Sequence, residues 1–162
     1  MSSQLPPIAE CTKMLDHFLL PLDQETAAQS VRAAEDGWNT RYPRRILLAY
    51  TADSYWKKRS EFVSDQQEIV ALMVRKWAKE LGGRLIKELW ARSGAKIVVR
   101  FGCEWYDSAG NWTRSRRNAN WEFDGNGLMK RRLARVNDFP IDEADRTMRW
   151  DRSGPRPAQT QI

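Results

Sequence analysis

The stretch KIVVRFGCEWYDSAGNWTRSRRNANWEF, residues 96–123, reads as two strands joined by a turn. In its first half apolar and polar side chains alternate, which is typical of a β-strand with one buried face. The turn Asp107-Ser-Ala-Gly110 predicts a three-residue loop with a bulge at Gly110, which keeps the same parity in the second strand. The predicted inner face therefore carries odd-numbered residues: Ile97, Val99, Phe101, Cys103, Trp105, Ser115, Arg117, Ala119, Trp121 and Phe123.

Two further strands are predicted on either side of this pair, at 84–92 and 128–137. Across the Ser93-Gly94 turn, paired residues have numbers that add to an odd value. The odd-numbered inner residues of the next strand therefore pair with even-numbered ones, which places Ile86, Glu88 and Trp90 on the inner face. Two registers stay open for the last strand. Simple pairing turns Met129, Arg131, Leu133 and Arg135 inward, whereas one bulge turns Arg132, Ala134 and Val136 inward.

The hydrophobic period before residue 84 is that of a helix. The first predicted helix begins at Asp23 or Thr26 and ends at Asn39-Thr40; the second begins at Pro43 and ends near Tyr50. A short extended piece at 54–62 follows, and then a third helix, which Asp65 and Glu68 cap and Gly82-Gly83 terminates. Helices followed by an antiparallel meander predict an α+β fold. We expect an N-terminal arm at 1–20, one domain at 21–150 and a flexible tail at 151–162.

Composition excludes several classes of function. Among 162 residues the single histidine is His17 and the two cysteines are Cys11 and Cys103, which argues against zinc sites, Ser-His mechanisms and a disulfide framework. The sequence shows neither a phosphate-binding glycine loop nor a metal-ligand cluster, so we expect no cofactor and no metal. Without an apolar run of membrane-spanning length or a signal peptide, a cytoplasmic protein that does not bind membranes is expected.

Six local runs resemble an uncharacterised, unknown-function branch of the nuclear transport factor 2-like (SnoaL-like) superfamily. They are VRAAEDGWNTR (31–41), AYTADSYW (49–56), RKWAKEL (75–81), RLIKELW (84–90), VRFGCEWYDSAGNW (99–112) and NWEFDGNGLMKRR (120–132). The resemblance covers about residues 20–150. It implies a cone-shaped fold in which helices close one side of a strongly curved sheet and leave a pocket between.

The superfamily includes ketosteroid isomerases, epoxide hydrolases, polyketide cyclases, dehydratases and non-catalytic binding domains, so the resemblance leaves the activity open. Isomerase-like members carry an acidic residue at the position matched here by Ala119. Relatives in the branch tend to read Trp-Arg-Asn-Arg where this chain has Trp56-Lys57-Lys58-Arg59. Both departures weaken any transfer of catalysis.

Eight tryptophans in so small a domain suggest a pocket lined by aromatic rings as well as a core. The predicted catalytic group is Glu88, whose carboxylate would gain proton affinity in such a pocket; an ion pair with Arg117 or a different strand parity is the alternative. The predicted ligand-binding residues are Tyr50, Trp56, Arg59, Trp77, Trp90, Cys103, Trp105, Arg117 and Trp121. The leading hypothesis is binding of a small, mostly apolar metabolite, with cofactor-free acid–base chemistry as an extension.

Two other functions are considered. The polar outer face of the sheet predicts a homodimer interface and, with it, a non-catalytic interaction domain; its residues are Arg100, Glu104, Asn118, Asn120 and Glu122. The net charge of +6 raises nucleic-acid binding through Lys57, Lys58, Arg114, Arg116, Lys130 and Trp112. We rank that function last, because these basic residues form no single stripe.

Overall fold

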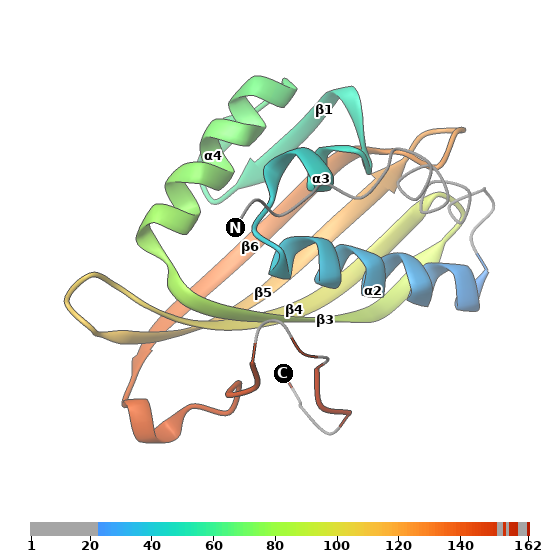
Figure 1. Cartoon of the computed structure of the whole chain (residues 1–162). Coiled ribbons are helices and arrows are strands. Elements are labelled where there is room, and N and C mark those ends of the chain that lie inside the picture. The colour runs from blue at the N-terminus through green and yellow to red at the C-terminus, as the bar shows by residue number, and fades with distance from the viewer. Residues whose placement is uncertain (1–22, 152–153, 155, 159–161) are drawn as a thin grey trace.

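The computed structural model describes residues 23–151, 154, 156–158 and 162; the predicted arm at 1–20, with Cys11 and His17, lies outside them. Three helices cover the concave face of a six-stranded sheet in this part of the chain (Figure 1). The helices are α2 (Gln24–Asn39), α3 (Pro43–Leu47) and α4 (Gln66–Lys79). The strands are β1 (Tyr50–Lys58), β2 (Glu61–Val63), β3 (Leu81–Ser93), β4 (Lys96–Tyr106), β5 (Trp112–Phe123) and β6 (Met129–Ile141). The predicted α+β cone is confirmed.

The central hairpin β4–β5 has the predicted register. The Asp107 N–H donates to the Asn111 carbonyl at 3.1 Å, and Gly110 adopts a φ of 83°, which closes a three-residue loop with a glycine bulge. Phe101 pairs with Arg117, and the odd-numbered residues of both strands point toward the helices. The alternation in residues 96–123 therefore places the inner face correctly.

The prediction for β3 is wrong over its first two-thirds. Ser93 pairs with Lys96 as expected, but the register shifts between Leu89 and Ala91, so that Lys87 pairs with Phe101. A bulge of this kind exchanges the two faces of the strand beyond it. As a result Lys87 points inward, whereas Glu88 is exposed and pairs with Arg100 on the outer face.

One bulge also sets the register of β6, as in the second of the two predicted alternatives. The shift between Glu122 and Phe123 pairs Trp121 with Arg132 and Ala119 with Ala134. Arg132 and Ala134 are buried on the inner face. A guanidinium group is thereby fixed inside the cone.

The predicted extended piece at 54–62 corresponds to two strands, β1 and β2, whose pairing the sequence does not predict. Tyr50 is the first residue of β1, not the end of a helix, and β1 runs parallel to β6, with Trp56 opposite Arg132. Helix α4 ends at Lys79, so Gly82 belongs to β3. Gly82 is required there because its φ is 60° and a Cβ atom would lie 2.4 Å from the Tyr106 ring.

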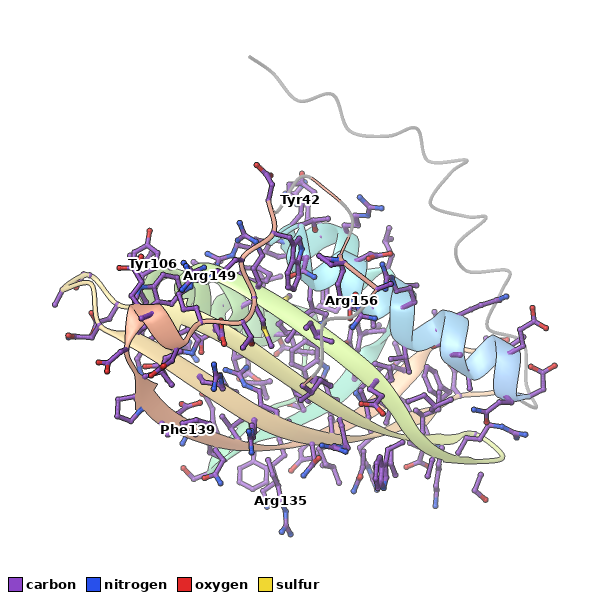
Figure 2. The ribbon with its side chains drawn as sticks, turned by 90° about the horizontal axis from the view of Figure 1, so that it is seen from below. Tyr42, Tyr106, Arg135, Phe139, Arg149 and Arg156 are labelled. Atoms are coloured by element: carbon purple, nitrogen blue, oxygen red, sulfur yellow. The ribbon has the colours of Figure 1, made fainter. Side chains whose placement is uncertain are left out.

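The C-terminal segment crosses the outer face of the sheet (Figures 1 and 2). Glu104, whose side chain is fully buried, accepts hydrogen bonds there from the Thr147 and Met148 backbone N–H groups at 3.0–3.1 Å. Arg114 donates twice to the same carboxylate, at 2.8 and 3.0 Å. Burial alone would raise the pKa of Glu104, but these donors lower it below its ordinary value.

We expect Glu104→Gln to lower the free energy of unfolding at pH 7 by about 2 kcal/mol, because the variant loses charge-assisted hydrogen bonds and turns an NH₂ group toward backbone donors. Urea denaturation measures the change, with the exposed Glu88→Gln as control. The folded-state pKa lies below the unfolded value, so the stabilisation is complete above about pH 4.5 and disappears as the pH falls through the folded pKa. An equal loss of unfolding free energy in Glu104→Gln and Glu88→Gln would contradict the stabilising role of the Glu104 carboxylate.

Candidate functional site

The centre of the inner face holds a lysine among aromatic rings. The Lys87 side chain is 4% exposed, and its Nζ lies 4.8, 5.0 and 5.3 Å from the ring centroids of Phe101, Trp121 and Trp38. This nitrogen has no hydrogen-bond partner among the described residues. A buried amine without a partner is costly, and such groups occur at functional sites more often than elsewhere in a core.

Arg132 lies beside Lys87 and shares two of its rings. The guanidinium carbon of Arg132 is 5.3 Å from the Trp38 centroid and 5.8 Å from the Phe101 centroid, with Trp56 at 5.0 Å. Its Nε has no partner among the described residues. Two basic side chains therefore face one aromatic cluster.

A buried ion-pair network borders this cluster. Glu80, at the end of α4, forms salt bridges with Lys76 and with Arg117, the latter at 3.1 Å. Arg117 also donates to the Ser115 hydroxyl at 3.2 Å, and Trp105 Nε1 donates to the same oxygen at 3.2 Å. Glu80 thus compensates two of the basic groups, while Lys87 and Arg132 keep no carboxylate partner in the described part of the chain.

These groups line a partly open cavity. Aromatic and basic side chains make up most of its wall, together with Glu80, Leu85 and Cys103: Trp38, Trp77, Phe101, Trp105, Lys76, Lys87, Arg117 and Arg132. The partly exposed residues Asn39, Arg41, Gly83 and Arg84 mark where it reaches solvent, between the end of α2 and the start of β3. We call it the inner cavity. A second, more apolar cavity lies on the other side of Trp38, against Tyr50, Trp121 and Met129.

Burial and positive neighbours change the acidity of these groups. Burial, followed by the charges of Arg132 and Arg117, lowers the pKa of Lys87 well below its ordinary value. Burial also lowers the pKa of the nearby Lys58 to about 8. Lys76 and Arg117 more than offset the burial of Glu80, so the pKa of that carboxyl is lowered and the group stays ionised.

Glu35 of α2 fixes the backbone behind Lys87. Its Oε1 accepts a hydrogen bond from the Lys87 N–H at 2.7 Å, and its Oε2 lies 3.5 Å from both Arg32 and Arg156. Figure 2 shows Arg156 beside this helix. Burial nevertheless raises the pKa of Glu35. A carboxylate thus positions the main chain of Lys87 without pairing with its amine.

The structure brings together some of the predicted site residues and separates others. Trp77, Cys103, Trp105 and Arg117 line the inner cavity; Tyr50 and Trp121 line the second one; Trp56 packs under Arg132. Arg59 lies outside, on the turn after β1, where it pairs with Asp138. The predicted inward orientation of Glu88 and Trp90 is wrong: Trp90 is 61% exposed, with the Arg100 guanidinium 4.8 Å from its ring. Whether the residues in the cavities bind a ligand stays a prediction.

The sequence analysis missed Trp38, Lys87 and Arg132 as site residues. Arg132 did appear in one of the two registers for β6, but Lys87 was placed on the outer face. The signal that could have found it was the pair of apolar residues beside it, Leu85 and Leu89, which share its parity. These residues face inward only if β3 contains a bulge, and nothing in residues 84–92 indicates one.

This arrangement is suited to a small molecule with an apolar body and a negative charge. The rings supply apolar contact, and two basic groups are available for charge pairing in a medium where such pairing is strong. No group of three or more metal-ligating side chains occurs among the residues that the structure describes, and no helix there could cross a membrane. Two predicted nucleic-acid contacts are already occupied, since Arg114 binds Glu104 and Trp112 lies under Arg146, at 3.6 Å from its guanidinium carbon.

Comparison with known proteins supports the fold and leaves the activity open. Residues 20–149 match the family described as "Protein of unknown function (DUF1348)". No curated protein matches the sequence. Among solved structures, a nuclear transport factor 2-like protein of unknown function from Burkholderia pseudomallei is similar, with a TM-score of 0.63 and 18% identity over 68% of this chain and 90% of that chain.

Two other similar structures have a named activity or a bound ligand. A pinacolase from Penicillium brevicompactum gives a TM-score of 0.60 at 12% identity, covering 70% of this chain and 87% of that one. A protein with the ketosteroid isomerase-like fold from Catenulispora acidiphila, in complex with trimethylamine, gives a TM-score of 0.58 at 11% identity. The match covers 64% of this chain and 82% of that chain. Identities this low establish the nuclear transport factor 2-like fold alone.

Replacing the unpartnered amine should stabilise the protein. We expect Lys87→Met to raise the free energy of unfolding by about 1–3 kcal/mol, because methionine fills a similar volume without a buried polar group. Lys76→Met is the matched control and should be destabilising, since it removes one partner of the Glu80 carboxylate. Chemical denaturation at pH 7 measures both. A destabilised Lys87→Met variant would mean that the amine has a partner in solution.

The same burial makes stability depend on pH. The folded-state pKa of Lys87 is lowered, so between that pKa and the ordinary value near 10.5 the unfolded chain binds a proton that the folded chain does not. Stability should therefore rise with pH across this interval. Denaturation curves of the wild type and of Lys87→Met, measured over this pH interval, isolate the contribution of Lys87 to the free energy of unfolding. If that free energy changes with pH by the same amount in both proteins, the amine is not neutral in the folded state.

Proposed function

Because the chain belongs to the family of unknown function DUF1348, we propose a function from its own cavity: it binds a small, mostly apolar organic acid there. The observation that carries this proposal is the pair of buried basic side chains, Lys87 and Arg132, that face Trp38 and Phe101 without a carboxylate partner among the described residues. An acid group on a ligand would supply the missing negative charge. The rings would contact the rest of the ligand.

The basic groups outnumber the acidic ones in this part of the core. Lys76 and Arg117 share Glu80, so the cavity wall keeps a positive excess even after the ion pairs are counted. Isolated buried charges are unfavourable, and a bound anion relieves that cost by charge pairing. An acid should therefore bind more tightly than a neutral molecule of the same shape.

Ligand binding is tested with a panel of benzoate, phenylacetate and hexanoate beside the corresponding neutral amides, followed by tryptophan fluorescence and calorimetry. We expect at least one acid to bind, and each acid that binds to do so at least about tenfold more tightly than its amide. Arg132→Met should weaken that binding about 10- to 100-fold, because a buried charge partner is lost. Arg131→Met is the matched control: its side chain is exposed and pairs with Glu122 on the outer face.

If the amides bind as well as the acids, or if Arg131→Met weakens binding as much as Arg132→Met, the buried basic pair is not the recognition element. Native mass spectrometry of the purified protein gives an independent measurement, since a retained small acid would be seen directly.

An interaction domain is the second candidate, and the exposure of Trp90 favours it. Trp90 lies on β3, at the edge of the described sheet, where an aromatic side chain could anchor a second copy of the chain. The C-terminal segment occupies part of the outer face around Glu104, which leaves the Trp90 end for contact. The predicted homodimer stays a prediction.

Sedimentation of Trp90→Ser tests this candidate. If a dimer uses this surface, the variant should dissociate at about tenfold or more higher concentration than the wild type, because a buried tryptophan anchor is typically worth 2 kcal/mol or more. Phe62→Ser, which removes an exposed ring from β2 at the other edge, is the control. A monomeric wild type would dismiss the candidate.

A further inference from the structure

We propose that Lys87 acts as a nucleophile and forms an imine with the carbonyl group of a 2-oxo acid held in the inner cavity. This inference rests on the proposed function, because the acid group must first bind near Arg132. It adds a covalent step and names the substrate class, an acid that carries a carbonyl group next to its carboxylate.

The position of the Lys87 amine sets it apart from other lysines of the chain. Its Nζ lines a cavity, is fully buried and has no hydrogen-bond partner among the described residues. Lys76 lines the same cavity but is held by Glu80, and Lys130 is half exposed and pairs with Glu122. Lys87 alone of these three presents a nitrogen that no carboxylate occupies.

A nucleophilic amine must be unprotonated. The apolar surroundings of Lys87 and the positive charges of Arg132 and Arg117 all disfavour the ammonium form, which is the same combination that activates lysines in amine-dependent enzymes. The lone pair on Nζ is therefore available at lower pH than the lone pair of an exposed lysine.

Arg132 and Lys87 are placed to act on adjacent groups of one molecule. Both approach Trp38 and Phe101: the lysine nitrogen to within 5.3 and 4.8 Å of the two centroids, and the guanidinium carbon to within 5.3 and 5.8 Å. A ligand that lies against these rings meets both. In a 2-oxo acid the carboxylate is bonded to the carbonyl carbon, so one group can pair with Arg132 while the other faces Lys87.

The step balances without a co-reactant. Nζ attacks the carbonyl carbon and forms the C–N bond, a proton passes from nitrogen to the carbonyl oxygen, and the product is a carbinolamine. The hydroxyl group then leaves as water with the second proton of the nitrogen, which gives the C=N bond, and the imine nitrogen becomes a cation when it takes up a proton from solvent. One water is released for each imine formed, and no electrons are exchanged with an oxidant or reductant.

The surroundings of Lys87 also suit the product. A protonated imine is a cation, and the rings of Phe101, Trp121 and Trp38 lie within 5.3 Å of the nitrogen that would carry the charge. Aromatic faces stabilise such cations in a desolvated site. The carboxylate of the same ligand supplies the counter-charge that the free cavity lacks.

Reductive trapping tests the inference on the full chain. The protein is incubated at pH 7 with pyruvate, 4-methyl-2-oxopentanoate or phenylpyruvate and treated with sodium cyanoborohydride, and labelled peptides are identified by mass spectrometry. We expect one adduct per chain on Lys87, with a mass increase equal to the probe less one oxygen atom. Its rate should saturate with probe concentration and exceed that of an exposed lysine such as Lys57 by at least about tenfold.

Controls separate this inference from the proposed function. The 2-hydroxy acid analogues, which lack the carbonyl group, should bind to the wild type without forming an adduct. Peptide mapping of the wild type locates the adduct without any variant, and Lys87→Met should form none at this position. Phenylacetone, which has the carbonyl group without the carboxylate, should label Lys87 far more slowly.

Each outcome decides one of the two proposals. If 2-oxo and 2-hydroxy acids bind in a manner sensitive to Arg132→Met but no adduct forms on Lys87, the imine is excluded and acid binding stands. Labelling spread over surface lysines at equal rates also excludes it. If none of these acids binds, the inference fails, and the proposed function fails with it when benzoate, phenylacetate and hexanoate do not bind either.

Discussion

A pair of buried basic side chains without a carboxylate partner among the described residues is the constraint on which the rest of this structure depends. Lys87 and Arg132 point into the same aromatic cluster, and Glu80, the carboxylate that lines the inner cavity, is already shared by Lys76 and Arg117. Folding must therefore provide rings to face the basic groups, burial to keep water scarce and an unprotonated state for the lysine. Three tryptophans, Trp38, Trp56 and Trp121, serve this purpose.

Two bulges create this arrangement. The one in β3 turns Lys87 inward and Glu88 outward, and the one between β5 and β6 turns Arg132 inward and Arg131 outward. In each case a single extra residue decides whether a charged side chain is solvated or buried. The chemistry of the cavity is thus set by the backbone register as much as by the choice of residues.

The fold was largely predictable from the sequence, and the site was not. Alternation in residues 96–123, together with the Gly110 turn, is a local signal that specifies the β4–β5 hairpin and places Arg117 and Trp121 correctly. Glu88 was misplaced because its parity was counted from the Ser93-Gly94 turn, and the bulge near Trp90 has no signature in nearby residues. The parallel pairing of β1 with β6 joins residues about 75 positions apart, so nothing local indicates that Trp56 and Arg132 meet. Long-range register is decided by packing of the whole domain.

Glu35 gives the far side of the sheet a connection to the cavity. One of its oxygens holds the amide of Lys87 and the other approaches Arg156, a residue of the segment that Glu104 fastens to the outer face through Thr147 and Met148. The cavity and the outer face are therefore connected through the contacts of two carboxylates, Glu35 and Glu104. Anything that displaces the C-terminal segment, such as a bulky fusion partner or a second chain docking there, would change the electrostatic environment of Glu35 and the support of Lys87. Affinity measured on a tagged protein would then differ from that of the native chain, although the tag never approaches the ligand.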